Sequence, residues 1–146
     1  MIHLVLLGLP PSSNHAYENL PRGGRRLSDQ GKRYKLETQG YLASNYRRQM
    51  TIFRPNAPYV MAVKFYFEQL VNSGYPDSAK TRYKRVDGSN RVKLLEDTLH
   101  LAGGVDDSQT FQSFWEKEQG VPERTLIWVW DREKEGSPFD AVFRSL

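Results

Sequence analysis

The side chains best suited to metal-assisted chemistry lie in two short polar segments. The first segment is Asp87-Gly-Ser-Asn90, followed by Lys93 and Asp97, and the second is Val105-Asp106-Asp107-Ser-Gln109. Carboxylate oxygens are the ligands that Mg²⁺ prefers, and the ion commonly takes one or two carboxylates together with water and phosphate. The same residues also have a structural explanation, because Asp87 or Ser89 could cap a helix and the aspartate pair could form a turn. The sequence leaves both explanations open.

Lys93 favours the chemical explanation. It lies in the first turns of an expected helix, where the helix dipole disfavours a cation, and it precedes Asp97 in the weaker order for an (i, i+4) ion pair. Its helix therefore gains little from it. Beside a phosphate, a lysine neutralises developing negative charge or holds the attacking water. The segment is thus a candidate site for phosphoryl transfer.

Hydrophobic periodicity predicts a single α+β domain over residues 1–146, with a mixed β-sheet and two main helices. Strands are expected over 2–9 and over 59–68, the second of them central in the sheet, and a strand pair is expected over 110–117 and 125–130. Helices are expected over 28–49, with Ser28 as N-cap, and over 90–102, with Gly103 and Gly104 as the stop. Residues 12–24 and 71–86 lack periodicity and are expected to be loops.

The spacing of the two acidic segments restricts how they can meet. A helix over 90–102 is about 20 Å long at 1.5 Å per residue, whereas the five residues 103–107 span at most about 17 Å. Asp107 must therefore return along the helix in a nearly extended chain, or a partner subunit must complete the site.

The composition excludes several classes of protein. The chain is 38% apolar and 26% charged, and no apolar run approaches the ~20 residues of a membrane span. The first apolar stretch, Leu4 to Leu7, is too short for a signal peptide, so we expect a cytoplasmic protein. With no cysteine, disulfide scaffolds, thiol catalysis and cysteine-bound zinc are excluded, and the three histidines are too scattered for a zinc site.

Positive charge is concentrated in the first two thirds of the chain. Residues 1–95 hold 16 Lys and Arg against 6 Asp and Glu, whereas residues 96–146 hold 5 against 11. The basic residues cluster at 22–26, 32–35 and 80–85, and Tyr34, Tyr75 and Tyr83 lie among or near them. Such clusters form either a solvated surface or a phosphate-binding surface, and the interleaved tyrosines favour nucleic acid.

Taken in order, these motifs resemble those of the RusA-type Holliday-junction resolvases of bacteria and their phages. The matching segments are Leu9-Pro-Pro-Ser-Ser-Asn14 with Tyr17, Ser28-x-x-Gly31-x-x-Tyr34, Asp87-x-x-Asn90-x-x-Lys93-x-x-x-Asp97, and Gly104-Val105-Asp106-Asp107-Ser-Gln109 with Lys117. The resemblance spans roughly residues 4–130. Its order and spacing make it specific, although no single segment would suffice.

The resemblance implies a homodimeric, Mg²⁺-dependent endonuclease that binds four-way DNA junctions and nicks two opposed strands, acting in DNA recombination and repair without contact with a membrane. Mn²⁺ is an alternative metal. By position, Asp87 and Asp107 are the expected metal ligands and catalytic residues, Asp106 is their acidic neighbour in the metal site, and Lys93 is the catalytic lysine. The cations expected to bind DNA are Arg25, Arg26, Arg82, Lys84, Arg85 and Lys117.

One position departs from the pattern. The family usually has a second aspartate two residues after the first, and this chain has Ser89 there. A neutral hydroxyl coordinates Mg²⁺ weakly and brings no charge. An alternative is therefore a non-catalytic junction-binding protein whose activity is lost or weakened through Ser89, and a further alternative is a basic RNA-binding domain.

Overall fold

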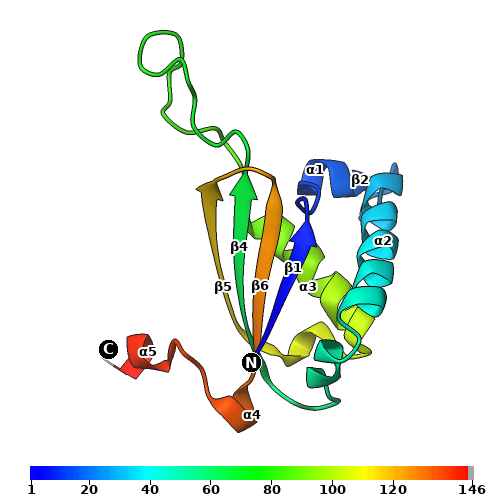
Figure 1. Cartoon of the computed structure of the whole chain (residues 1–146). Coiled ribbons are helices and arrows are strands. Elements are labelled where there is room, and N and C mark those ends of the chain that lie inside the picture. Colours follow the sequence, from blue (N-terminus) through cyan, green and yellow to red (C-terminus); the bar gives the residue numbers. More distant parts are fainter. Residues whose placement is uncertain (145–146) are drawn as a thin grey trace.

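The computed structural model describes residues 1–144 and shows one mixed four-stranded sheet with two main helices (Figure 1). The strands of this sheet are β1 (Ile2–Leu7), β4 (Tyr59–Phe67), β5 (Thr110–Gln119) and β6 (Arg124–Asp131), in the order β1-β6-β4-β5. β4 runs parallel to β5 and antiparallel to β6, and β1 pairs antiparallel with β6. The α+β class and the interior position of the strand at 59–67 are confirmed.

The expected pairing of β5 with β6 is wrong, because β4 lies between them. A short connection suggests a hairpin, but the connection is also long enough to pass one strand. The four residues from Gly120 to Glu123 reach about 13 Å, and two strands separated by a third lie about 10 Å apart. β5 instead joins β4 through a helical crossover, which is the connection that a parallel pair requires.

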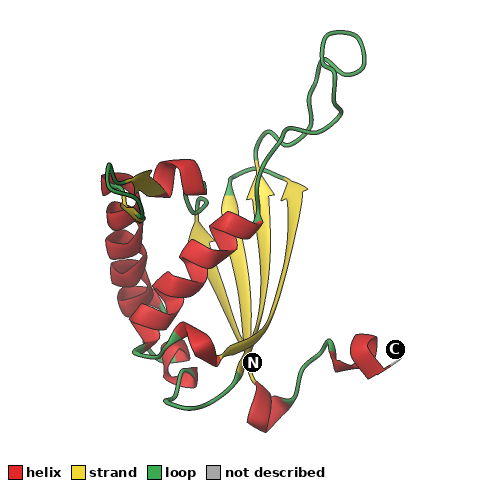
Figure 2. Cartoon of the chain, turned by 180° about the vertical axis from the view of Figure 1, so that it is seen from behind, coloured by secondary structure: helices red, strands yellow, loops and turns green. Residues whose placement is uncertain are grey.

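Both main helices, α2 (Asp29–Asn45) and α3 (Ser89–Gly103), cover the same face of the sheet (Figure 2). The hydrophobic core lies between these helices and the sheet, and it is built from alternate residues of the strands and from one side of each helix. Its fully buried members include Leu4, Leu42, Phe65, Leu95 and Ile127. Each such side chain contributes roughly 1.5 to 3 kcal/mol through burial.

The opposite face of the sheet carries Trp128 and Trp130 together with Phe114. The C-terminal segment, which contains α4 (Arg132–Glu135) and α5 (Asp140–Arg144), contacts this face. Phe139 of that segment stacks on Phe114 with 3.7 Å between ring centroids. The tryptophans therefore lie on strands, as the sequence indicates.

Local capping determines where the helices begin and end. Ser28 caps α2 by accepting a hydrogen bond from the Gly31 amide at 3.1 Å, as expected. The helix ends at 45 rather than 49, because the hydroxyl of Tyr46 bonds Val5 of β1 and the chain then enters the 3-10 helix η1 (Gln49–Ile52). α3 ends where Gly104 adopts a left-handed conformation with φ of 69°, which glycine tolerates best.

Two projections leave the body of the molecule near the start of α3. The hairpin consists of β2 (Tyr17–Asn19), β3 (Arg25–Leu27) and their connection, and it follows the one-turn helix α1 (Ser13–Ala16). The wing comprises residues 70–85 and extends beyond the sheet (Figure 1). Its base is held by backbone bonds from Asn72 to Arg82 and from Lys84 to Leu70, both 2.9 Å long. The expected loop over 12–24 is therefore wrong where α1 and β2 form, because β2 finds its partner in β3, whereas the expected loop over 71–86 corresponds to the wing.

Candidate active site

Asp87 stands directly before α3 and its carboxylate is held by its neighbours. The Ser89 hydroxyl donates to Oδ1 at 2.8 Å, the Asn90 amide N–H donates to the same oxygen at 3.3 Å, and the Asn90 side chain donates to Oδ2. These hydrogen bonds, led by that from Ser89, lower the pKa of Asp87. The carboxylate is exposed and is ionised at neutral pH. It also accepts a hydrogen bond at the start of α3, in agreement with the structural explanation for this residue.

Lys93 and Asp107 meet beside α3. The Lys93 Nζ lies 3.8 Å from Asp107 Oδ2 and 3.8 Å from Asp97 Oδ1. After Gly104 the chain doubles back along the helix into the 3-10 helix η2 (Asp107–Gln109), so one chain brings the lysine and the second acidic segment together. The chain thus returns along α3 as far as Lys93, and whether Asp107 completes one site with Asp87 stays a prediction.

Gln109 holds the returning segment against the body. Its side-chain amide donates to the carbonyls of Arg54 and Ala57, both at 2.8 Å. Asp106 caps η2 by accepting from the Ser108 amide at 2.9 Å, and hydrogen bonds from Ser108 lower the pKa of Asp106. One Asp106 oxygen is thus engaged locally, whereas Asp107 projects with 56% of its side chain exposed.

β5 positions the start of α3 through side chains on its helix-facing side. Trp115 lies against Gly88, where any Cβ would collide with the indole ring. Lys117 donates to the Val86 carbonyl at 3.1 Å, which anchors the chain one residue before Asp87. The sequence identified Lys117 only as a DNA-binding cation and Trp115 only as a strand residue, because neither contact is local.

Glu96 belongs to this region and was missed by the sequence reasoning. It follows Lys93 by three residues on the same side of α3 and lies near Ser113 of β5. Burial raises the pKa of Glu96, and the negative charges of Asp97 and Asp107 add to the rise, opposed by Ser113 and Lys93. Its helical spacing from Lys93 is the signal that could have identified it.

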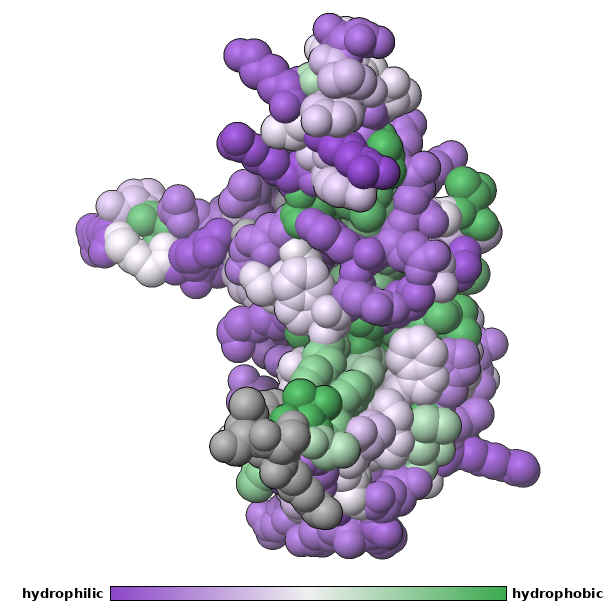
Figure 3. Space-filling view, turned by 90° about the vertical axis from the view of Figure 1, so that its left-hand side faces the viewer, coloured by the Kyte–Doolittle hydropathy of each residue, from purple (hydrophilic) through white to green (hydrophobic). Residues whose placement is uncertain are grey.

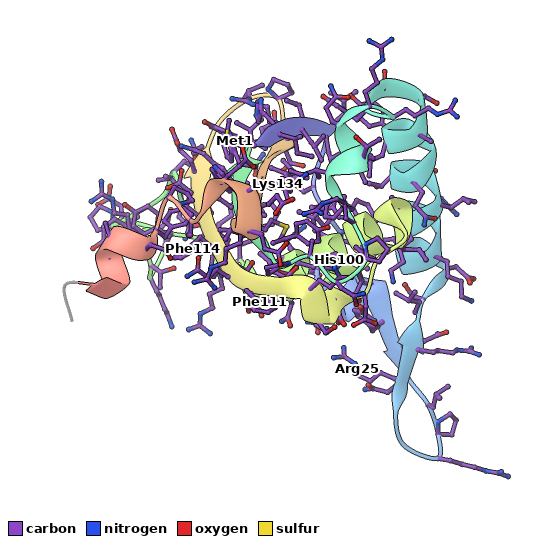
Figure 4. All side chains as sticks on the ribbon, turned by 90° about the horizontal axis from the view of Figure 1, so that it is seen from below. Met1, Arg25, His100, Phe111, Phe114 and Lys134 are labelled. Carbon is purple, nitrogen blue, oxygen red and sulfur yellow. The ribbon has the colours of Figure 1, made fainter. Side chains whose placement is uncertain are left out.

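His100 is a structural residue. It is buried between α3 and the start of β5 and is labelled in Figure 4. Its Nε2 lies 2.8 Å from the Thr110 hydroxyl. Burial lowers the pKa of His100. The neutral ring therefore helps to hold the returning segment near α3.

The basic residues lie on the hairpin and on the wing. Arg25 stands on the projecting hairpin (Figure 4), with its guanidinium carbon 5.4 Å from the Tyr17 ring centroid, and Arg26 pairs with Glu18 at 2.6 Å. On the wing, Arg82 lies over Tyr83 at 5.4 Å. Figure 3 shows the upper end of the molecule, where the wing lies, as largely hydrophilic. Cations and exposed tyrosines thus lie together on a projection close in sequence to Asp87.

The cations of the wing differ in their contacts and in their exposure. Lys84 donates from Nζ to Gln69 Oε1 at 2.7 Å, and Arg85 is exposed. Tyr75 and Tyr83 are about half exposed, at 47% and 52%. An exposed aromatic beside a cation is a usual combination in surfaces that bind nucleic acid.

The donor set is compatible with a hard divalent cation. Asp87 and Asp107 are exposed carboxylates, and Mg²⁺ needs only one or two of these when water and phosphate supply the rest. Within residues 1–144, no group of three or more histidine or carboxylate side chains is close enough to hold a metal by itself. An ion held by one or two of these carboxylates would take its remaining ligands from water or substrate. Within the same residues, no helix is long and apolar enough to cross a membrane.

Comparison with known proteins identifies the family of the chain. The family model described as Endodeoxyribonuclease RusA matches residues 8–129, a segment that contains the hairpin, the wing and both acidic motifs. A search of curated proteins finds no match for the chain. Because the family model covers more than half of the sequence, the chain belongs to the RusA family of endodeoxyribonucleases.

Proposed function

We propose that this protein is a Mg²⁺-dependent endonuclease that resolves four-way DNA junctions by paired nicking. The observation that carries the proposal is the contact of Lys93 with Asp107 at 3.8 Å, in a family of endodeoxyribonucleases. It joins the two acidic motifs on one side of α3. A lysine beside a carboxylate that can bind a divalent cation is an arrangement that can support phosphodiester hydrolysis.

The proposed roles follow from the chemistry of each side chain. Asp87 and Asp107 would hold the metal, with Asp106 as their acidic neighbour. When bound, Mg²⁺ supplies a polarised phosphate oxygen and a more acidic water. Lys93 stabilises the negative charge that develops on the phosphate. The hairpin and wing cations, with Lys117, hold the DNA backbone.

The decisive experiment is cleavage of a synthetic four-way junction with Mg²⁺ and with EDTA. We expect paired nicks only with metal, and no nicking of a linear duplex of the same sequence. Binding without cleavage at any concentration of Mg²⁺ or Mn²⁺ would favour the non-catalytic alternative, which Ser89 motivates. Preferential competition by single-stranded RNA would favour the RNA-binding alternative.

Replacing Arg25, Arg26, Lys84 or Arg85 with alanine should weaken junction binding and flatten its salt dependence. Each lost phosphate contact should reduce the slope of log K against log salt by about 0.9, because fewer counterions are released. Binding titrations at several salt concentrations measure this. Arg48→Ala, at the opposite end of α2, is the matched control. An unchanged slope would indicate that the four residues form a solvated surface and do not contact phosphates.

Ser89→Asp should lower the metal concentration needed for half-maximal cleavage. The Ser89 hydroxyl is 2.8 Å from Asp87 Oδ1, so an aspartate at position 89 brings a second carboxylate beside the first. We expect the wild-type protein to be active but to bind metal weakly and to perform better with Mn²⁺, which tolerates looser coordination. Position 89 begins α3, where an acidic residue is favourable, so stability should change little.

Ser89→Asn is the control for this prediction, since it adds an oxygen ligand without charge and should leave the metal requirement near that of the wild type. If Ser89→Asp has the same metal dependence as the wild type, or is inactive, residue 89 does not contact the metal. Asp87, Asp106 and Asp107 would then have to form the site.

We also propose a homodimer, because two symmetric nicks in a twofold-symmetric junction need two active sites. Light scattering should give about twice the 16.9 kDa chain mass. A monomer at micromolar concentration that stays a monomer on the junction would contradict paired cleavage.

A further inference from the structure

Asp97 is the point where three separate elements meet beside the active site. Its Oδ1 lies 3.8 Å from Nζ of Lys93 on the same helix, and its Oδ2 lies 3.9 Å from Nζ of Lys35 on α2. The hydroxyl of Tyr17, on the hairpin, faces the same carboxylate. Burial, and then the charge of Asp97, raise the pKa of Tyr17. The carboxylate thus connects α3, α2 and the hairpin.

The side chains of Asp97 and Lys35 are much less exposed than that of Lys93. Asp97 is 24% exposed and Lys35 is 19% exposed, whereas Lys93 is 67% exposed. Packing alone therefore does little to hold Lys93, and a long unrestrained lysine samples many rotamers. The contacts that can restrain its ammonium are two ion pairs, one to Asp97 and one to Asp107, each 3.8 Å long.

These two carboxylates differ in what they can do during the proposed reaction. If Asp107 binds a divalent cation, its charge is taken up by that ion, which also repels the lysine. Asp97 then remains to hold the ammonium. Asp97 is a poor metal ligand itself, because each of its two oxygens already faces a lysine ammonium.

We propose that Asp97 is the positioning residue of Lys93, held in place by Lys35 and Tyr17, and that it keeps the ammonium aimed at the reacting phosphate. This inference rests on the proposed function for the role of Lys93. The restraint on the lysine is a property of the metal-free protein, so it can be measured without any cleavage.

The first test measures the mobility of Lys93 by NMR side-chain order parameters at its Cε, without metal or DNA. In the wild type we expect Lys93 to be more ordered than Lys80 on the wing. Asp97→Asn should lower the Lys93 value toward that of Lys80, because in the metal-free protein only the ion pair with Asp107 then remains, and Asp97→Glu should retain more of the order. Glu37→Gln, the same chemical change at an exposed position of α2, should leave it unchanged. A Lys93 as mobile as Lys80 in the wild type would overturn the proposal.

The second test is a double-mutant cycle on junction cleavage. Asp97→Asn should lower kcat about tenfold with unchanged junction affinity and unchanged metal requirement, because only the aim of the lysine is lost. In a Lys93→Ala background the same change should have less than about a twofold effect. Independent losses that multiply would overturn the proposal, as would a raised metal requirement, which would identify Asp97 as a ligand.

The two tests separate this inference from the proposed function. If the wild type does not cleave junctions, the proposed function fails, while the order parameters still decide whether Asp97 restrains Lys93. If the wild type cleaves but Asp97→Asn leaves both Lys93 order and kcat unchanged, the positioning role fails and the proposed function stands.

Discussion

Asp87→Asn and Asp107→Asn should each reduce junction cleavage by roughly a thousandfold or more while junction binding stays the same or becomes tighter. Each change removes an anionic oxygen needed for the metal and keeps the volume of the side chain. Removing negative charge also reduces repulsion of the DNA backbone. Single-turnover cleavage in Mg²⁺ and equilibrium binding in EDTA measure the two effects separately.

The structure indicates that these variants will fold. The amide oxygen of an asparagine at position 87 can still accept hydrogen bonds from Ser89 and the Asn90 backbone, as the carboxylate does. Asp107 is exposed at the surface of η2. Asp29→Asn, a like change at the exposed start of α2, is the matched control and should leave cleavage intact. Cleavage at the wild-type rate by either active-site variant would refute its assignment as a ligand.

Lys93→Ala should lower the rate of cleavage about a hundredfold and change junction affinity little. In the proposed function, the lysine acts on charge that develops only in the transition state, whereas the hairpin and the wing would hold the ground-state phosphate. The measurement is single-turnover cleavage at saturating protein, with binding measured in parallel. Lys93→Arg is the informative companion, because it keeps the charge but replaces a compact ammonium by a planar guanidinium.

The opposite pattern would change the role of this residue. If Lys93→Ala loses affinity and retains the rate at saturation, Lys93 is a phosphate clamp and not a catalytic group. Its position between Asp97 and Asp107 would then serve only to balance two carboxylates.

The features that could be predicted from the amino-acid sequence are those that depend on near neighbours in the chain. Alternation over Tyr59–Phe67, the cap at Ser28 and the stop at Gly104 each involve residues a few positions apart, and all three appear in the structure. The acidic motifs were found in the same way, from residue type and spacing. Their carboxylates stand where α3 begins and after it ends.

Tertiary structure alone decided which distant segments meet. A periodic strand carries no record of which strand will pair with its edge, so the interior position of β4 was predicted from its apolar character but its neighbours, β5 and β6, were not. In the same way, Lys35 reaches Asp97 and Trp115 covers Gly88 across long stretches of chain. The return of Asp107 to Lys93 was one of two possibilities on length alone. It was selected by long-range contacts such as those of Gln109 with Arg54 and Ala57, because only the packed core brings those partners within hydrogen-bonding distance.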